Sequence, residues 1–250
     1  MTSFDAVGNI VIFSEEFKGI KEEAKRLLKE LKNIETVAVK TKQHSGIYRT
    51  KKVKIIAGKK SKETIHKENN VKVKLNIETC YFSPRLSNER LRIAKQIKKD
   101  EIILCMFSGV GIYPLVFAKN SKAKEIYGVE INPNCHKYAL ENLKLNKIKN
   151  IKLYNSDVKK VLPKIRKKFD RIVMPLPKNA EDFLDVAVKK IKNNGIIHFY
   201  DFERGIDIPK KTIEKIRDKI KKFKILRIIK CGSYGPDKFR VCADLIVYLN

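Results

Sequence analysis

The sequence predicts an α/β fold, in which a mostly parallel sheet closed by an antiparallel hairpin follows a small α+β domain. From residue 101 onward, short apolar runs alternate with stretches of helical spacing. The runs are apolar on both faces, as is typical of parallel strands that helices cover on both sides. The last two runs are joined only by the turn-rich residues 231–238. Because parallel strands need a longer crossover, these two runs are expected to form a hairpin.

The first hundred residues have a different texture. Apolar residues recur at helical spacing over residues 20–32, which predicts an amphipathic helix. Short strands are expected over residues 36–40, 52–57 and 71–78. In the last of these, apolar and polar residues alternate, as they do in a strand with one buried face.

The larger part of the chain is expected to contain five parallel strands. These lie at residues 102–107, 126–131, 151–154, 171–174 and 196–202, with helices near 112–119, 133–145, 158–168, 179–192 and 209–222, and closing strands at 223–229 and 239–249. The arrangement resembles the sheet of Rossmann-like class I methyltransferases. A dinucleotide-binding fold would continue with another helical crossover in place of the hairpin.

Length and composition set the organisation and the compartment. The 250 residues, 43% of them hydrophobic, are enough for two folded domains, which we place at residues 1–80 and 81–250. The five cysteines are scattered, without a C-x-x-C pair, and the four histidines are dispersed, so we expect no disulfide framework and no metal site. The chain begins without a signal-peptide pattern and has no apolar run that could cross a bilayer. We therefore expect a cytoplasmic protein without a membrane partner.

The charge points to a polyanionic partner. Lys and Arg total 56 against 28 Asp and Glu, a net charge of +28, and nucleic acid is the commonest partner of so basic a protein. Six lysines give the small domain a basic face, and residues 209–222 form a second basic element. The six are Lys51, Lys52, Lys54, Lys59, Lys60 and Lys62. Such lysines are equally often only a solvated surface.

The loop after the first parallel strand has the features of a ligand-binding turn. Gly109 and Gly111 allow a tight turn that opens a helix, although the third glycine of the dinucleotide fingerprint would fall at Pro114. At the end of the next strand stands Glu130, whose carboxylate can accept hydrogen bonds from the two hydroxyls of a ribose. The alternatives are a simple turn and a solvated acid.

The next two strand ends complete a set of four. Asp157 can accept the amino group of an adenine while the backbone of Val158 donates, and Asp157 can equally cap the following helix. The fourth strand ends in Met174-Pro175-Leu176-Pro177, a rigid turn at the edge where such folds bind ligands. The ordered set predicts an adenosine site.

A polar and aromatic segment precedes the larger sheet. Residues 81–90 include Ser83, Arg85 and Arg90 beside two aromatic residues, which is what a site for a base, a phosphate or a carboxylate would use. The alternative is an interdomain turn followed by an amphipathic helix with exposed arginines.

The chain resembles the archaeal and eukaryotic tRNA guanosine-37 methyltransferase family over nearly its whole length. The resemblance lies in the motifs ETIHKEN, TCYFSPRLSNER, MFSGVGIYPL, GVEINPN, ENLKLN, DRIVMPLP and GSYGP. It implies S-adenosylmethionine as cofactor and, as partner, a tRNA whose position 37 lies next to the anticodon. One branch of the family transfers a methyl group, and another transfers the 3-amino-3-carboxypropyl group to carbon 7 of 4-demethylwyosine during wybutosine synthesis.

Two departures from the family pattern favour the aminocarboxypropyl branch. Methylating members usually have Asn-Leu-Pro where this chain has Pro175-Leu176-Pro177, and an Asp at the position of Cys105. Proline offers the target base no donor, and a thiol cannot replace the charge beside the methionine moiety. We therefore expect a monomeric enzyme acting on tRNA-Phe and releasing methylthioadenosine. The alternatives are a guanosine-37 methyltransferase and a non-catalytic RNA-binding protein.

The resemblance also implies roles for individual residues. Glu130 would hold the ribose, Asp157 and Val158 the adenine, and Gly109 the loop beneath the cofactor. Ser83 and Arg90 are candidates for the methionine end or the ribose edge, and Arg85 for the methionine carboxylate or an RNA phosphate. Glu89 and Asp201 are possible general bases, each with a surface or capping role as its alternative.

Overall fold

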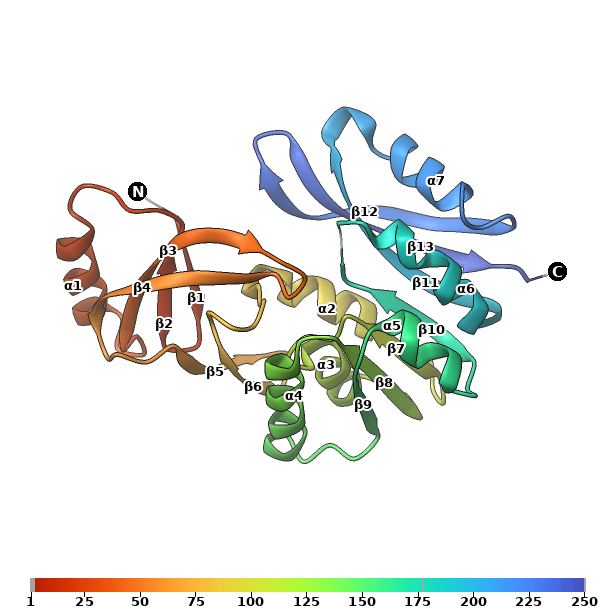
Figure 1. The fold of residues 1–250 in the computed structure, drawn as a ribbon, viewed down its shortest axis with the longest axis horizontal. Helices are drawn as coiled ribbons and strands as arrows, with labels where there is room; N and C mark the ends of the chain where they lie inside the picture. Colours follow the sequence, from red (N-terminus) through yellow and green to blue (C-terminus); the bar gives the residue numbers. More distant parts are fainter. Residues whose placement is uncertain (1–2, 177, 250) are drawn as a thin grey trace.

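A computed structural model describes residues 3–176 and 178–249, and in it two separate main sheets lie side by side (Figure 1). The N-terminal sheet has the order β1-β2-β3-β4, with β2 and β3 parallel and the other pairs antiparallel. Its elements are β1 (Phe4–Val7), β2 (Ile10–Phe13), α1 (Ile20–Glu30), β3 (Thr36–Ser45) and β4 (Thr50–Gly58). The predicted helix and the two predicted strands are present, whereas β1 and β2 were not expected.

A two-stranded hairpin follows, formed by β5 (Glu63–Glu68) and β6 (Val71–Asn76). It packs on the larger domain through α4 (Pro133–Leu145). Asn142 and Asn146, one helical turn apart, bond the backbone N–H and C=O of Lys74 and Lys72 at 2.6–3.0 Å, as a further strand would. The ENLKLN motif therefore seals the edge of β6. The hairpin also joins the N-terminal sheet, because its residues Val71, Val73 and Leu75 share a buried cluster with residues of β1 and β2.

The larger sheet has seven strands in the order β12-β13-β11-β10-β7-β8-β9. Strands β7 to β11 are parallel, and β13 runs antiparallel to both β11 and β12, so the predicted fold class is confirmed. The elements are α2 (Ser87–Ala94), β7 (Ile102–Met106), α3 (Ile112–Asn120), β8 (Glu125–Glu130), α4, β9 (Ile151–Asn155), α5 (Val158–Val161), β10 (Phe169–Met174), α6 (Leu184–Lys190), β11 (Ile191–Arg204), α7 (Lys210–Arg217), β12 (Phe223–Gly235) and β13 (Lys238–Val247).

Two buried clusters fill the two faces of this sheet. One contains residues of α3 and of β6, and the other contains residues of α5, α6 and α7. The predicted helix over 158–168 was too long, because α5 ends at Val161 and a short 3-10 turn with Pro163 follows. The predicted loop 231–238 was also too long, since β12 and β13 extend to within two residues of each other.

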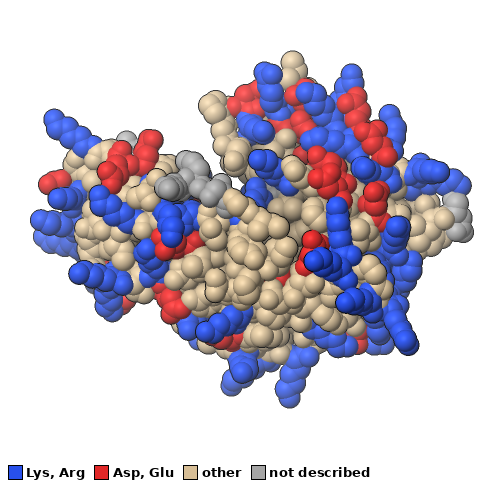
Figure 2. All heavy atoms as spheres, viewed as in Figure 1, with Lys and Arg blue, Asp and Glu red and all other residues tan. Residues whose placement is uncertain are grey.

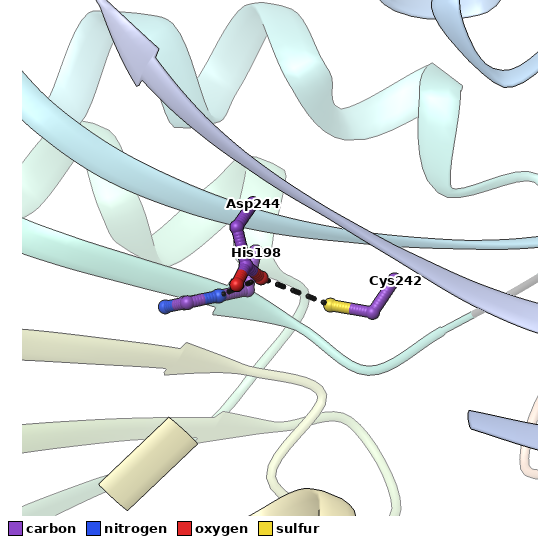
Figure 3. Close-up of side chains that lie close together, drawn as sticks. All are labelled: His198, Cys242 and Asp244. Carbon is purple, nitrogen blue, oxygen red and sulfur yellow. Dashed lines mark hydrogen bonds and ion pairs between the residues drawn. The ribbon is translucent and has the colours of Figure 1, made fainter. Parts of the chain in front are cut away.

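A buried charge network joins α2 to β13, and Figure 3 shows its His198 and Asp244 side chains beside Cys242. His198 Nδ1 lies 2.6 Å from Asp244 Oδ1, and Arg171 Nη1 lies 2.7 Å from His198 Nε2. Because the arginine can only donate, Nε2 carries no proton and Nδ1–H donates to the carboxylate. Arg92 of α2 adds bonds of 2.6 and 3.1 Å to Asp244. Although burial opposes ionisation, the bonds from His198 and Arg92 hold the pKa of Asp244 well below its usual range.

The same network gives a pH-dependent stability. Burial lowers the pKa of His198, so the folded protein keeps this ring neutral while the unfolded chain protonates it below about pH 6.5. We expect the free energy of unfolding to fall below that pH by up to about 1.4 kcal/mol per unit. His198→Gln should remove this slope, measured by urea unfolding between pH 7 and 5. Equal slopes in the variant and the parent would contradict the assignment.

Candidate active site

A cavity of about 190 Å³ opens at the carboxyl ends of the parallel strands. Its walls include residues 107–110 after β7, 129–131 at the end of β8, 156–158 after β9 and 175–176 after β10. Two further segments close it, residues 81–83 and the turn between β3 and β4 at residues 47–49. The four strand ends expected to form one site therefore do meet, and the N-terminal domain contributes to the same cavity.

The loop after β7 turns through backbone conformations with positive φ. Gly109 and Gly111 have φ of +56° and +83°, and Phe107 has +58°, which is unusual for a residue with a side chain. The turn presents the N–H of Gly109 to Glu130 Oε2 at 2.7 Å. The role expected for Gly109, shaping the floor of the site, fits this position.

Glu130 joins two loops. Its second oxygen, Oε1, accepts from the N–H of Asn132 at 2.7 Å, in the turn that begins α4. Burial raises the pKa of Glu130, although the bonds from Asn132 and Gly109 lower it. A carboxylate has about four acceptor positions, so two remain for hydroxyl donors in the cavity. The geometry supports the expected ribose contact.

Asp157 and Val158 also line the cavity. One oxygen of Asp157 accepts from the N–H of Lys159 at 2.7 Å and caps α5, which was the alternative interpretation of this residue. The capping bond uses Oδ1, and Oδ2 is left for a ligand. The capping role of Asp157 is therefore compatible with the predicted contact to an adenine.

Ser108 is a cavity residue that sequence reasoning missed. Its hydroxyl is buried, lines the cavity and has no hydrogen-bond partner among the described residues. A buried hydroxyl without a partner costs roughly 1–3 kcal/mol, which a polar ligand would recover. The observation fits a cofactor with hydroxyl and amino groups. The sequence did contain a signal for Ser108. The turn between Phe107 and Gly109 requires only a small residue, so a hydroxyl at this position indicates a polar contact.

The three candidates from residues 81–90 separate in the structure. Ser83 and Arg90 line the cavity, but Arg85 does not; its side chain is 61% exposed and Nε donates to Asp5 at 2.6 Å. The guanidinium of Arg90 is held by Glu68 at 2.6 and 2.5 Å and donates to the carbonyl of Ser83 at 3.2 Å. Arg90 thus fixes the Ser83 backbone against the wall of the cavity.

Neither candidate general base lines the cavity. Glu89 accepts from Tyr200 at 2.7 Å and pairs with Arg92, while Asp201 pairs with Lys215 at 2.9 Å. Burial raises the pKa of Asp201 to about 6, although Lys215 lowers it. Both carboxylates are parts of ion pairs behind the cavity wall, so the geometry favours structural roles for them.

Of the two residues that depart from the family pattern, Pro175 lines the cavity and Cys105 does not. Pro175 lines the cavity, as the argument for a changed base pocket requires. Cys105 is fully buried inside β7 and is not part of the wall, and burial raises the pKa of its thiol. The expected loss of charge beside the methionine moiety therefore has no direct counterpart in the cavity. Pro177 lies outside the described residues.

The expected basic face of the small domain is only partly free. Lys51 is buried, which lowers its pKa to about 8, because it shares the inward side of β4 with Val53. Lys54, Lys59 and Lys62 form ion pairs with acidic neighbours. In the second basic element, Lys215 faces Asp201 and Glu203. Figure 2 shows Lys and Arg side chains at both ends of the molecule, around a central area with few charges.

His198, Cys242 and Asp244 are residue types that can ligate a metal ion, and they lie together in the core. Their ligand atoms lie within 4.8 Å of one another, but Arg171 and Arg92 already bond the histidine and the aspartate. Two guanidinium charges at this distance disfavour a metal ion. No helix of the described chain is long and apolar enough to cross a membrane.

Comparison with known proteins identifies the family. The TRM5/TYW2 methyltransferase domain matches residues 64–228, and the TYW2 N-terminal domain matches residues 1–61. The chain belongs to the TRM5/TYW2 family. This family depends on S-adenosylmethionine, which is the cofactor that the sequence predicts. The two matches adjoin at residues 61–64, where β5 begins.

Both branches of the family occur among the similar proteins. The chain is 38% identical to the tRNA (guanine(37)-N(1))-methyltransferase Trm5b of Pyrococcus abyssi, over 98% of the chain and 75% of that protein. It is 35% identical to Trm5b of Methanocaldococcus jannaschii, over 97% and 70%. It is 31% identical to the tRNA(Phe) (4-demethylwyosine(37)-C(7)) aminocarboxypropyltransferase of the same organism, over 96% of both.

Solved structures agree with the assignment. The crystal structure of Trm5b from Pyrococcus abyssi superimposes with a TM-score of 0.89 at 37% identity, covering 99% of this chain and 76% of that one. The structure of TYW2 from Methanocaldococcus jannaschii with AdoMet superimposes with a TM-score of 0.76 at 25% identity, covering 99% and 100%. The predicted family, fold class and cofactor are thereby confirmed.

Glu130 should control cofactor affinity. We expect Glu130→Gln to weaken S-adenosylmethionine binding about tenfold, because an amide keeps one acceptor but cannot receive both N–H groups and both ribose hydroxyls. Glu130→Ala should abolish binding in calorimetry. Glu125→Gln, at the start of the same strand, is the matched control and should bind like the parent. Unchanged affinity in the two Glu130 variants would contradict the ribose role.

Proposed function

We propose that the chain transfers a methyl group from S-adenosylmethionine to the purine at position 37 of a tRNA. We choose methyl transfer because of the sequence identities to two relatives from one organism. Against Methanocaldococcus jannaschii the chain is 35% identical to the methyltransferase and 31% to the aminocarboxypropyltransferase. Because both relatives come from the same organism, a general difference in amino-acid usage between organisms does not explain the difference in identity. The position of Cys105 behind the wall also withdraws one of the two arguments for the other branch.

The residues of the cavity would act by positioning. Glu130 would hold the ribose, Asp157 and the backbone of Val158 the adenine, and the Ser108 hydroxyl a polar group between them. When bound, the cofactor supplies a sulfonium centre that is already activated for transfer. Catalysis then depends on holding the acceptor atom in line with one carbon and excluding water. The turn at residues 47–49 and Pro175 form the part of the wall that would face the acceptor.

Aminocarboxypropyl transfer to 4-demethylwyosine is the second candidate, and Pro175 favours it. This residue borders the cavity where methylating relatives usually present an asparagine, so the acceptor base would receive no side-chain hydrogen bond there. A base pocket with fewer polar groups suits a tricyclic acceptor better than guanine. The preference for tRNA-Phe belongs to this candidate.

Two isotopic labels on the cofactor test the proposal. S-adenosylmethionine labelled separately on the methyl and carboxyl carbons is incubated with tRNA-Phe, either unmodified or carrying 4-demethylwyosine. We expect methyl label in the RNA and S-adenosylhomocysteine in solution, with the accepting RNA identifying the base. Carboxyl label in the tricyclic RNA, with release of methylthioadenosine, would establish the second candidate. Cofactor and RNA binding without transfer of either label would leave a non-catalytic RNA-binding protein.

A further inference from the structure

Arg240 differs from the other buried arginines in its partners. Arg90 and Arg171 are each held by two carboxylate oxygens, of Glu68 and Glu101. Arg240 is 9% exposed, yet within the described chain its side chain donates only to the hydroxyl of Tyr81, at 2.9 Å. Its Nε is buried without a partner. A buried guanidinium without a carboxylate is costly, so an anion from outside the chain would stabilise this one.

The surroundings of Arg240 form an aromatic platform at the edge of the cavity. Arg240 lies opposite Phe202 on β11 and Gly232 on β12, and its guanidinium sits 5.2 Å from the Phe202 ring. Gly232 brings no side chain to cover that flank. The ring of Tyr234, which is 64% exposed, lies 4.3 Å from the Phe202 ring. Phe202, Tyr234 and Arg240 are called the hairpin platform below.

The hairpin platform is connected to the active site through Tyr81. The hydroxyl of Tyr81 accepts from Arg240, its ring faces the guanidinium of Arg49 at 5.6 Å, and Tyr81 and Arg49 both line the cavity. A chain of groups thus runs from the cavity to the exposed ring of Tyr234. An exposed aromatic ring beside a guanidinium is the combination that binds a nucleotide, through base stacking and a phosphate contact.

We propose that the hairpin platform binds a nucleotide of the tRNA adjacent to the acceptor, with its base on Tyr234 and its phosphate on Arg240. The inference rests on the proposed function, because it takes a tRNA as the substrate. Arg240 donates to Tyr81, and Tyr81 lines the cavity, so a nucleotide on the platform would be a neighbour of the one that enters the cavity. The platform would hold the strand in register while the acceptor base enters the cavity.

Binding of tRNA-Phe at several salt concentrations tests the platform. Arg240→Gln should weaken binding about tenfold at low salt and reduce the slope of log affinity against log salt by about one. Tyr234→Ala removes an exposed ring without disturbing the core and should cost roughly 5- to 100-fold. Arg204→Gln is the matched control, because it removes the same charge from an exposed residue of β11 that pairs with Asp237. It should bind within about threefold of the parent.

Two further measurements make the result specific. An abasic nucleotide at position 36 or 38 should weaken binding to the parent protein but not further to Tyr234→Ala, since both changes remove one stacking contact. Calorimetry should show that Arg240→Gln keeps its affinity for S-adenosylmethionine. Loss of cofactor affinity in Arg240→Gln would mean that Arg240 binds the methionine carboxylate. RNA binding equal to that of Arg204→Gln would mean that Arg240 binds no ligand. Either result overturns the proposal. A parent protein that binds no tRNA would instead refute the proposed function.

Discussion

The Glu130 carboxylate is the constraint on which the rest of the site depends. It receives the N–H of Gly109 from the loop after β7 and the N–H of Asn132 from the turn into α4, both at 2.7 Å. Two loops that would otherwise be independent are thereby fixed to one acid at the end of β8. The side chain of Asn132 extends the connection to the carbonyl of Thr79, just before the segment that closes the cavity. One carboxylate consequently fixes the positions of the loop after β7 and of the border of the cavity.

The larger domain could be predicted well because its buried strands are continuous apolar runs in the sequence. Apolar runs on both faces locate five parallel strands, and the short link before β13 identifies the closing hairpin. Strands β1 and β2 escaped because each is only four residues long, too short for a periodicity to show. Strand β6 was predicted and β5 was not, and the asparagines that bond the edge of β6 come from α4, about 70 residues later, where no local pattern reveals them.

Candidate site residues that follow a strand could be predicted well from the sequence. Those elsewhere in the chain could not. Gly109, Glu130 and Asp157 stand at strand ends, so the topology alone brings them to one edge. The environments of Arg85, Glu89 and Asp201 depend on partners far away in the sequence. Arg85 meets Asp5, and Glu89 meets Tyr200, and no local pattern reveals such pairs. Arg240 was missed for the converse reason, since an absent partner leaves no trace in a sequence.

The ion pairs also change the meaning of the net charge. Several of the 28 acids are used in buried pairs with arginine, among them Glu68, Glu101 and Asp244. Each buried pair removes one acid and one base from the surface, so the total of +28 is unchanged while the ratio of basic to acidic groups facing solvent rises above two to one. A polyanion therefore meets fewer repelling carboxylates than the composition suggests. Such a surface attracts polyanions from many directions, and the attraction weakens as the salt concentration rises.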